Sequence, residues 1–104
     1  MVHSRLGCST ISFRHHDLSG ALNWIAALGF AEIDLGALPG VCDHVPYELT
    51  PAGVEAVADT VSATGLRVRS INGDIGDLNR PLGDHARAAR DHHLEMLLEL
   101  AATA

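Results

Sequence analysis

Two patterns of hydrophobic and polar positions alternate along this chain, one typical of buried strands and one typical of helices. Runs of apolar and β-branched residues predict buried strands over 5–13, 31–35 and 66–71. Between and after these runs, apolar residues recur every three or four positions, which is typical of a helix with one buried face. The pattern therefore predicts a strand followed by a helix, three times in succession.

Start signals support the first two helices. Asp17 or Ser19 is a suitable N-cap for the first helix. Thr50 followed by Pro51 is a strong start for the second, with threonine as N-cap and proline at the first helical position. The helices are expected over about 17–28, 50–64 and 84–104.

The connections between these elements differ in length according to their direction. Each helix-to-strand joint is short and centred on a glycine, in Leu28-Gly29-Phe30 and again in Thr64-Gly65-Leu66. The strand-to-helix loops, 36–49 and 72–83, are long and contain the unusual polar residues. In βα-repeat architectures the loops after the strands build the active site, so these two loops hold most of the candidate residues.

Strict alternation of strand and helix requires parallel strands. An open doubly wound sheet and a (β/α)8 barrel both have this order, and about 35 residues per unit repeated eight times gives the size of a typical barrel. Residues 12–16 after the first strand lack the glycine-rich fingerprint of a dinucleotide-binding sheet. We therefore expect an α/β chain of three consecutive βα units of a (β/α)8 TIM barrel, with residues 1–104 forming the N-terminal part of one incomplete barrel domain.

Composition and charge exclude several classes of partner. Seven basic residues against 13 acidic ones give a net charge of −6, and the arginines are scattered along the sequence, which argues against nucleic acid and anionic membranes. No apolar run has the length of a membrane span or a secretory signal, so a cytoplasmic protein is expected. Cys8 and Cys42 are expected to be reduced and packed, with a catalytic Cys42 as the alternative.

Carboxylates and histidines near the strand ends are the first candidates for a site. Asp34 lies near the end of the second strand, and Glu32 projects from the same side of that strand. Asp34 either binds a substrate or accepts a hydrogen bond that caps the loop. His15 and His16 follow the first strand, where they either line the mouth of a barrel or lie in a solvated loop.

The loop after the second strand has the richest chemistry. Its stretch 42–47 contains a carboxylate, an imidazole and a phenol close together, and Asp43 and His44 are the candidate acid/base groups. As a loop side chain, His44 is expected to contribute to binding rather than to folding. The alternative is a structured loop held by internal hydrogen bonds.

The loop after the third strand is rich in asparagine, aspartate and glycine. This composition superficially resembles a calcium loop but lacks the terminal glutamate of an EF-hand. The alternative to a binding loop is plain turn formation. The polar candidates here are Asn72, Asp74, Asp77 and Asn79.

Several stretches taken together are specific enough to suggest a family. They are Arg5–Phe13, Ala27–Phe30, Glu32–Leu35, Gly65–Val68 and Asn72–Asp74. In order and spacing they resemble the N-terminal part of the xylose-isomerase-like TIM barrels, and within these the sugar phosphate isomerase/epimerase group. The similarity extends over nearly all of this chain and about the first three of a barrel's eight units.

The resemblance implies an enzyme that uses a divalent metal (Mn, Mg, Co or Zn) to move a proton within a sugar or sugar phosphate. In that family the metal ligands, typically two glutamates, an aspartate and a histidine, lie at the ends of later strands, so it assigns no metal ligand in this chain. This chain alone is therefore expected to lack isomerase activity. The substrate-binding residues that the resemblance implies are Ser12, Phe13, Asp34, His44, Asn72 and Asp74.

A three-stranded parallel sheet with helices on one face leaves the other face uncovered. We expect that face to carry the apolar residues of Leu6–Ile11 together with Ile33, Leu35, Val68 and Ile71. The chain is therefore expected to form a homo-oligomer or to associate with the remainder of a barrel. The alternative to an enzyme-derived chain is a non-enzymatic small α/β binding or assembly module.

Overall fold

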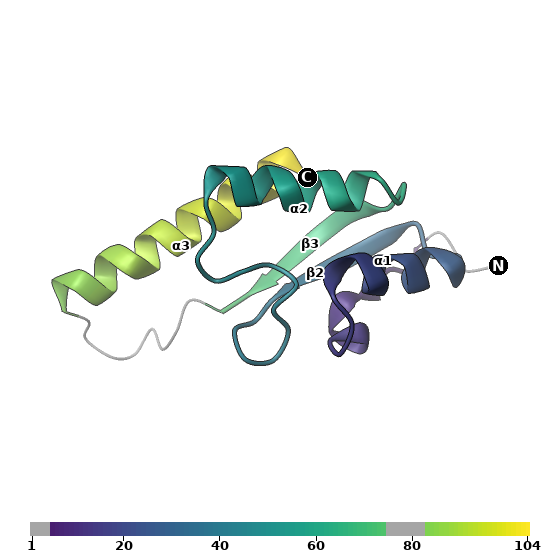
Figure 1. The fold of residues 1–104 in the computed structure, drawn as a ribbon, viewed down its shortest axis with the longest axis horizontal. Helices are drawn as coiled ribbons and strands as arrows, with labels where there is room; N and C mark the ends of the chain where they lie inside the picture. Colours follow the sequence, from purple (N-terminus) through teal and green to yellow (C-terminus); the bar gives the residue numbers. More distant parts are fainter. Residues whose placement is uncertain (1–4, 75–82) are drawn as a thin grey trace.

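The computed structural model describes residues 5–74 and 83–104, which form a three-stranded sheet with helices packed against it (Figure 1). The strands are parallel and lie in the order β1-β2-β3, which confirms the predicted α/β class of three consecutive βα units, and they form an open sheet. The elements in chain order are β1 (Cys8–Ser9), the 3-10 helix η1 (Thr10–Phe13), α1 (Leu18–Ala27), β2 (Glu32–Ala37), α2 (Pro51–Ser62), β3 (Arg67–Gly73) and α3 (Asp84–Thr103).

The first strand is much shorter than the sequence predicts. A strand was expected over 5–13, whereas only Cys8–Ser9 pairs with β2 and the next four residues form η1. The Ser9 hydroxyl accepts a hydrogen bond from the amide of Ile11 (3.3 Å), and such a local bond competes with the strand ladder. β2 and β3 instead run about two residues beyond their predicted ends, because they pair with each other over their whole length.

The helix ends follow the predicted signals. Asp17 is the N-cap of α1, where its Oδ1 accepts a hydrogen bond from the amide of Gly20 (2.7 Å), and Thr50 caps α2 in the same way. Gly29 and Gly65 turn the two short joints with φ angles of 93° and 76°, a region that strains any other residue. In the two described ranges, no helix combines the length and the apolar character needed to cross a membrane.

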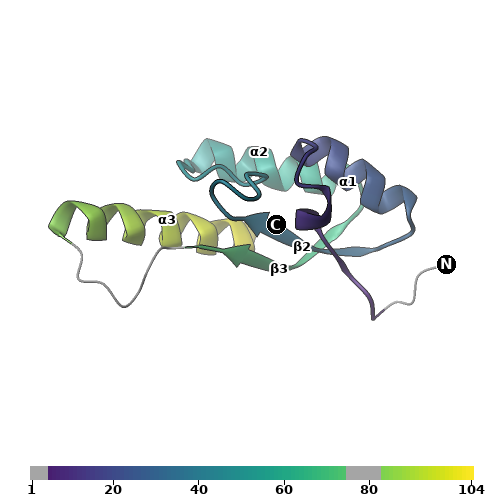
Figure 2. The ribbon, with the colours of Figure 1, turned by 90° about the horizontal axis from the view of Figure 1, so that it is seen from below.

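The helices cover one face of the sheet. In the view of Figure 2, α1 and α2 lie on the same side of the strands, and α3 packs against α2 and β3. Fully burying one large aliphatic side chain contributes about 1.5–3 kcal/mol, so this layer carries most of the favourable free energy of folding. The core between the layers includes Leu22, Ile25, Ile33, Leu35, Val54 and Leu100, which are all essentially inaccessible to solvent.

The other face of the sheet is polar, and the prediction of an apolar open face is wrong. Ile33 and Leu35 lie in the core beneath the helices, and Val68 and Ile71 pack against the same core. Side chains alternate along a strand, so the burial of Ile33 and Leu35 turns their neighbours to the open side. The residues that face outward on β2 are therefore charged.

Candidate functional site

A β-bulge shapes the open face of the sheet. The pairing of Ile33 with Val68 is followed by that of Asp34 with Ser70, which leaves Arg69 as an extra residue on β3. Arg69 and Ser70 are both exposed, whereas Val68 packs against the core. The bulge therefore brings two successive polar side chains to the open face, as bulges near functional sites often do.

Asp34 stands at the centre of this face and is contacted from both neighbouring strands. Its Oδ1 accepts a hydrogen bond from the Ser70 hydroxyl on β3 at 2.6 Å. Its Oδ2 is 3.4 Å from the Ser9 hydroxyl on β1. A half-buried carboxylate held between two hydroxyl groups is thus built across all three strands, and the sequence-based candidate Asp34 lies within it.

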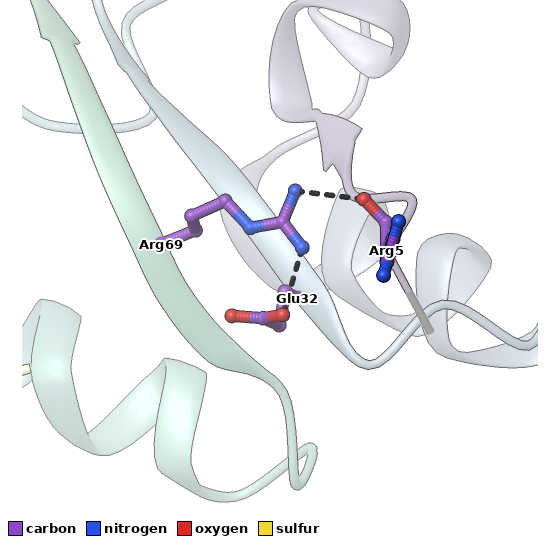
Figure 3. Close-up of polar contacts among 3 residues, drawn as sticks. All are labelled: Arg5, Glu32 and Arg69. Carbon is purple, nitrogen blue, oxygen red and sulfur yellow. Dashed lines mark hydrogen bonds and ion pairs between the residues drawn. The ribbon is translucent and has the colours of Figure 1, made fainter. Parts of the chain in front are cut away.

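An ion pair between Arg69 and Glu32 lies at the amino-terminal part of the same face, two residues before Asp34 on β2. Figure 3 shows the Arg69 side chain between Glu32 and Arg5. Nη2 of Arg69 donates to Oε1 of Glu32 at 2.8 Å, and Nη1 donates to the backbone carbonyl of Arg5 at 3.2 Å. The hydrogen bond from Arg69 holds the pKa of Glu32 below its usual value, and the positive charges of Arg69 and Arg67 add to this effect. The arginines that look scattered in the sequence are therefore partly gathered in space.

The His44 side chain is internal. It is only 7% exposed, and its Nε2 lies 2.8 Å from the backbone carbonyl of His16. A carbonyl oxygen can only accept, so Nε2 of His44 donates in this hydrogen bond. The other ring nitrogen, Nδ1, forms a hydrogen bond with Sγ of Cys42 at 3.2 Å. Both ring nitrogens are thus used inside the protein.

Thr10 connects this pair to the sheet. The amide of Gly36 on β2 donates to Oγ1 of Thr10 at 2.8 Å, and the same oxygen lies 3.9 Å from Sγ of Cys42. A Cβ atom at Gly36 would come within 2.6 Å of that sulfur, so only glycine allows this close approach. The alternative interpretation of a structured loop with internal hydrogen bonds therefore describes the loop after β2, and both cysteines are free thiols.

The remaining candidates lie around the carboxyl ends of the strands without forming a cluster. Ser12 is exposed on η1, and Phe13 packs partly buried against the core. Asn72 is exposed at the end of β3, and no hydrogen bond among the described residues joins it to Ser12 or Asp34.

Two acidic candidates occupy exposed loop positions near these strand ends. Asp43 is exposed and accepts a hydrogen bond from the amide of Gly40 at 3.2 Å, which is ordinary turn chemistry. Asp74 is exposed after β3, and its amide donates to the carbonyl of Ala37 at 3.3 Å. Asp77 and Asn79, the last candidates of that loop, lie outside the described residues.

The described residues were searched for clusters of side chains that could bind a metal ion. Within 5–74 and 83–104, no group of three histidine, cysteine, aspartate or glutamate side chains is placed to hold one metal ion. Three or more protein ligands are usual for a transition-metal centre.

Comparison of the chain with protein-family models, with curated proteins and with solved structures found no match. The fold and the geometry of the open face are thus the observations on which a functional proposal rests, together with the resemblance in sequence. Sequence reasoning found Asp34 but missed Ser9, Ser70 and Arg69, since these reach it only through the strand register and the bulge.

The first prediction concerns the His44 ring. We expect His44→Ala to lower the free energy of unfolding by about 2–4 kcal/mol, because it opens a cavity and removes the side-chain partner of the His16 carbonyl and one of the two contacts of the Cys42 thiol. The control is His15→Ala, at an exposed position next to His16. It should change the free energy of unfolding by less than about 0.5 kcal/mol. Urea denaturation of the two variants measures both effects, and equal midpoints would contradict an internal role for His44.

The second prediction concerns the ion pair. Arg69→Gln should move the pKa of Glu32 up towards its usual value, whereas Arg67→Gln should move it less, because Arg67 acts only through its charge. The lowered pKa means that the pair is complete at neutral pH and is lost as the pH falls through the pKa of Glu32. A 13C titration of the Glu32 carboxyl group measures this, and a larger shift in Arg67→Gln would show that the assigned cause is wrong.

Proposed function

We propose that the open face of the sheet is the substrate-binding wall of a cytoplasmic protein similar to the sugar phosphate isomerases and epimerases. The observation that carries this proposal is the carboxylate of Asp34, set between the hydroxyls of Ser9 and Ser70 on an uncovered sheet face. Parallel sheets are usually apolar on both faces. A polar face here is suited to a ligand that is itself rich in hydroxyl groups.

The chemistry of Asp34 fits such a ligand. An ionised carboxylate has about four acceptor positions, and two are used by the serine hydroxyls. The remaining positions can accept hydrogen bonds from sugar hydroxyls, and bonds to a charged acceptor are stronger than those between neutral groups. The hydroxyl oxygens of Ser9 and Ser70 can also accept hydrogen bonds. Asp34 and the two serines can therefore bind two neighbouring hydroxyl groups of a sugar together.

The proposed role of this chain is binding and orientation of the substrate. Proton transfer between sugar carbons needs a free acid/base group, and both nitrogens of His44 are engaged within the protein. His44 is therefore a positioning residue that fixes the loop after β2 at the carboxyl edge of the sheet. In the family that this chain resembles, the acid/base groups and the divalent metal lie at the ends of later strands.

The third prediction tests the binding wall. Asp34→Asn keeps the shape of the side chain but removes its charge, so we expect binding of a pentose such as ribose to weaken at least about fivefold. The amide signals of Ser9 and Ser70 in an NMR titration report on this contact. Asp59→Asn, an exposed position on α2, makes the same change of charge elsewhere and serves as the control. Unchanged affinity in Asp34→Asn would contradict the proposal.

A second candidate function, an assembly module, is favoured by an apolar groove of about 350 Å³ between β3 and α3. Leu94 and Leu98 remain 38% and 63% exposed along it. β3 has a single strand neighbour in the described part of the chain. An apolar surface beside a sheet edge is complementary to its own copy across a twofold axis, so the occupant we propose is a second copy of this chain.

The fourth prediction tests this assembly. Sedimentation should show the chain as a species heavier than its monomer mass of 11.0 kDa, and Leu98→Glu should return it to that mass by placing a charge in the contact. Leu28→Glu, at a position 52% exposed after α1, is the control and should leave the association intact. A wild-type chain that remains at 11.0 kDa over the micromolar range would exclude the assembly.

A further inference from the structure

A cavity of about 240 Å³ lies between α3 and the segment that leads into α2. Its two walls are far apart in the sequence but lie side by side in the fold (Figure 1). Residues 47–50 form one wall, and Ala89, His92 and His93 of α3 form the other. The cavity shares no residue with the apolar groove beside Leu98 or with the polar face around Asp34. It is therefore a separate candidate for a binding site.

His93 is the unusual residue of this cavity. It is only 3% exposed, and its Nε2 atom is buried without a hydrogen-bond partner among the described residues. Buried polar atoms nearly always have a partner, because an unpaired one loses its hydrogen bonds to water. Within 5–74 and 83–104, no other side-chain nitrogen or oxygen is in this state. The adjoining cavity has room for the partner that Nε2 lacks.

The other ring nitrogen of His93 decides what kind of partner this is. Nδ1 lies 3.1 Å from the backbone carbonyl of Tyr47, and a carbonyl oxygen can only accept, so Nδ1 donates in this bond. An imidazolium ring would bury a positive charge with no partner at Nε2, so the geometry favours the neutral ring. In the neutral ring the lone pair is on Nε2, which therefore accepts. The partner is an N–H or O–H donor.

We propose that this cavity binds a small primary amine, whose ammonium group donates a hydrogen bond to Nε2 of His93. The exposed carboxylate of Glu48 lines the same cavity and attracts a positive charge. Tyr47 and Leu49 provide apolar surface for the alkyl part of the ligand, and an aromatic ring also attracts a cation over its face. The net charge of −6 favours cationic ligands in general. This site goes beyond the proposed function and does not depend on it.

An anion is the main alternative, because the cavity borders the amino terminus of α2, and helix starts attract anions through their free amides. At this start Pro51 has no amide hydrogen, and the amide of Gly53 already donates to Oγ1 of Thr50 at 3.1 Å. An anion would also meet the carboxylate of Glu48 and the lone pair on Nε2 of His93. The cavity therefore favours a donor of positive charge over an anion.

Tyr47 provides a signal for occupation of the cavity. Its ring lies against the imidazole of His93, with ring centroids 4.3 Å apart and planes tilted by 32°. The Tyr47 residue is 45% exposed, so its ring can shift without disturbing the core. Because Nε2 is buried, we expect the Tyr47 ring to move when an amine reaches that nitrogen. Tyr47 is the single tyrosine of the chain, so its ring signals are unambiguous.

The test is an NMR titration of the 104-residue chain at about pH 8, where imidazoles are ordinarily neutral and alkylamines are still charged. The probes share a butyl chain and differ in their head group. They are butylammonium, butyltrimethylammonium, which has no N–H donor, and pentanoate, which is an anion. We expect millimolar butylammonium to shift the Nε2 signal of His93 and the ring signals of Tyr47, as suits a ligand of about five non-hydrogen atoms. The other two probes should leave Nε2 unchanged.

Three variants locate the contact. His93→Phe keeps an aromatic ring but removes the accepting nitrogen, so it should weaken butylammonium binding at least about tenfold. Glu48→Gln should weaken it roughly threefold, because an exposed charge is lost. Glu55→Gln, at an exposed position of α2, makes the same change of net charge and serves as the control. It should stay within about twofold of wild type.

A further arm separates two sources of the amine. Tighter binding of N-acetyl-lysine methylamide than of butylammonium would assign the site to a lysine side chain of a partner protein. Tighter binding of butylammonium would assign it to a free amine. Both results uphold an amine site.

Several results would overturn the proposal, and most need only the wild-type chain. A hydrogen on Nε2 of His93 in the free protein would show that this nitrogen is no acceptor. Signals that ignore butylammonium would mean that water alone satisfies Nε2, and a stronger response to pentanoate would indicate an anion site. Equal losses in Glu48→Gln and Glu55→Gln would also contradict a local contact. None of these results bears on sugar binding at Asp34.

Discussion

β2 lies between the other two strands, and its side chains alternate between two environments. Ile33 and Leu35 are buried beneath the helices, while Glu32 and Asp34 face the open side. Because the side-chain period of a strand is two, a shift in register by one residue would exchange these sets. It would place two carboxylates in the apolar core, where an unpaired charge is very unfavourable. The hydrophobic core and the polar face are thus two consequences of a single register.

The loop after β2 illustrates how polar residues can be used up by the fold. Gly36 leaves room for the sulfur of Cys42, which is hydrogen-bonded to His44. The other ring nitrogen of His44 donates to the carbonyl of His16. Polar groups buried in a loop need partners, and here the side chains supply them to one another and to the backbone. The loop with the richest candidate chemistry in the sequence therefore mainly stabilises the fold through its internal hydrogen bonds. The binding chemistry that remains available lies on the strands.

Local features of the fold could be predicted from the sequence, and those that depend on distant partners could not. The caps at Asp17 and Thr50 and the glycine turns at Gly29 and Gly65 are decided by residues next to them. The early end of β1 is an exception, because it depends on a local hydrogen bond from the Ile11 amide to Ser9 that competes with a pattern favouring a strand.

The residues of the candidate site also differ in how far the sequence could predict them. Asp34 was recognisable because a carboxylate at a strand end is unusual in itself. The serines and the arginine that surround it become neighbours only through the parallel register and the bulge at Arg69. Neither feature leaves a signal in one strand alone, since register depends on two strands together.

The polar face also limits what can cover it. Parallel sheets normally have a second layer, and an apolar layer over this face would desolvate Glu32, Asp34 and Arg69 together. Burying such groups costs several kcal/mol per ion unless each remains well paired, so an apolar cover would be opposed by the charges beneath it. Further strands, a second copy or a ligand that lies here must bring hydrogen-bonding groups or water. The groove beside α3 differs in this respect, because the large side chains exposed along it are the leucines Leu94 and Leu98, which an apolar cover would not oppose.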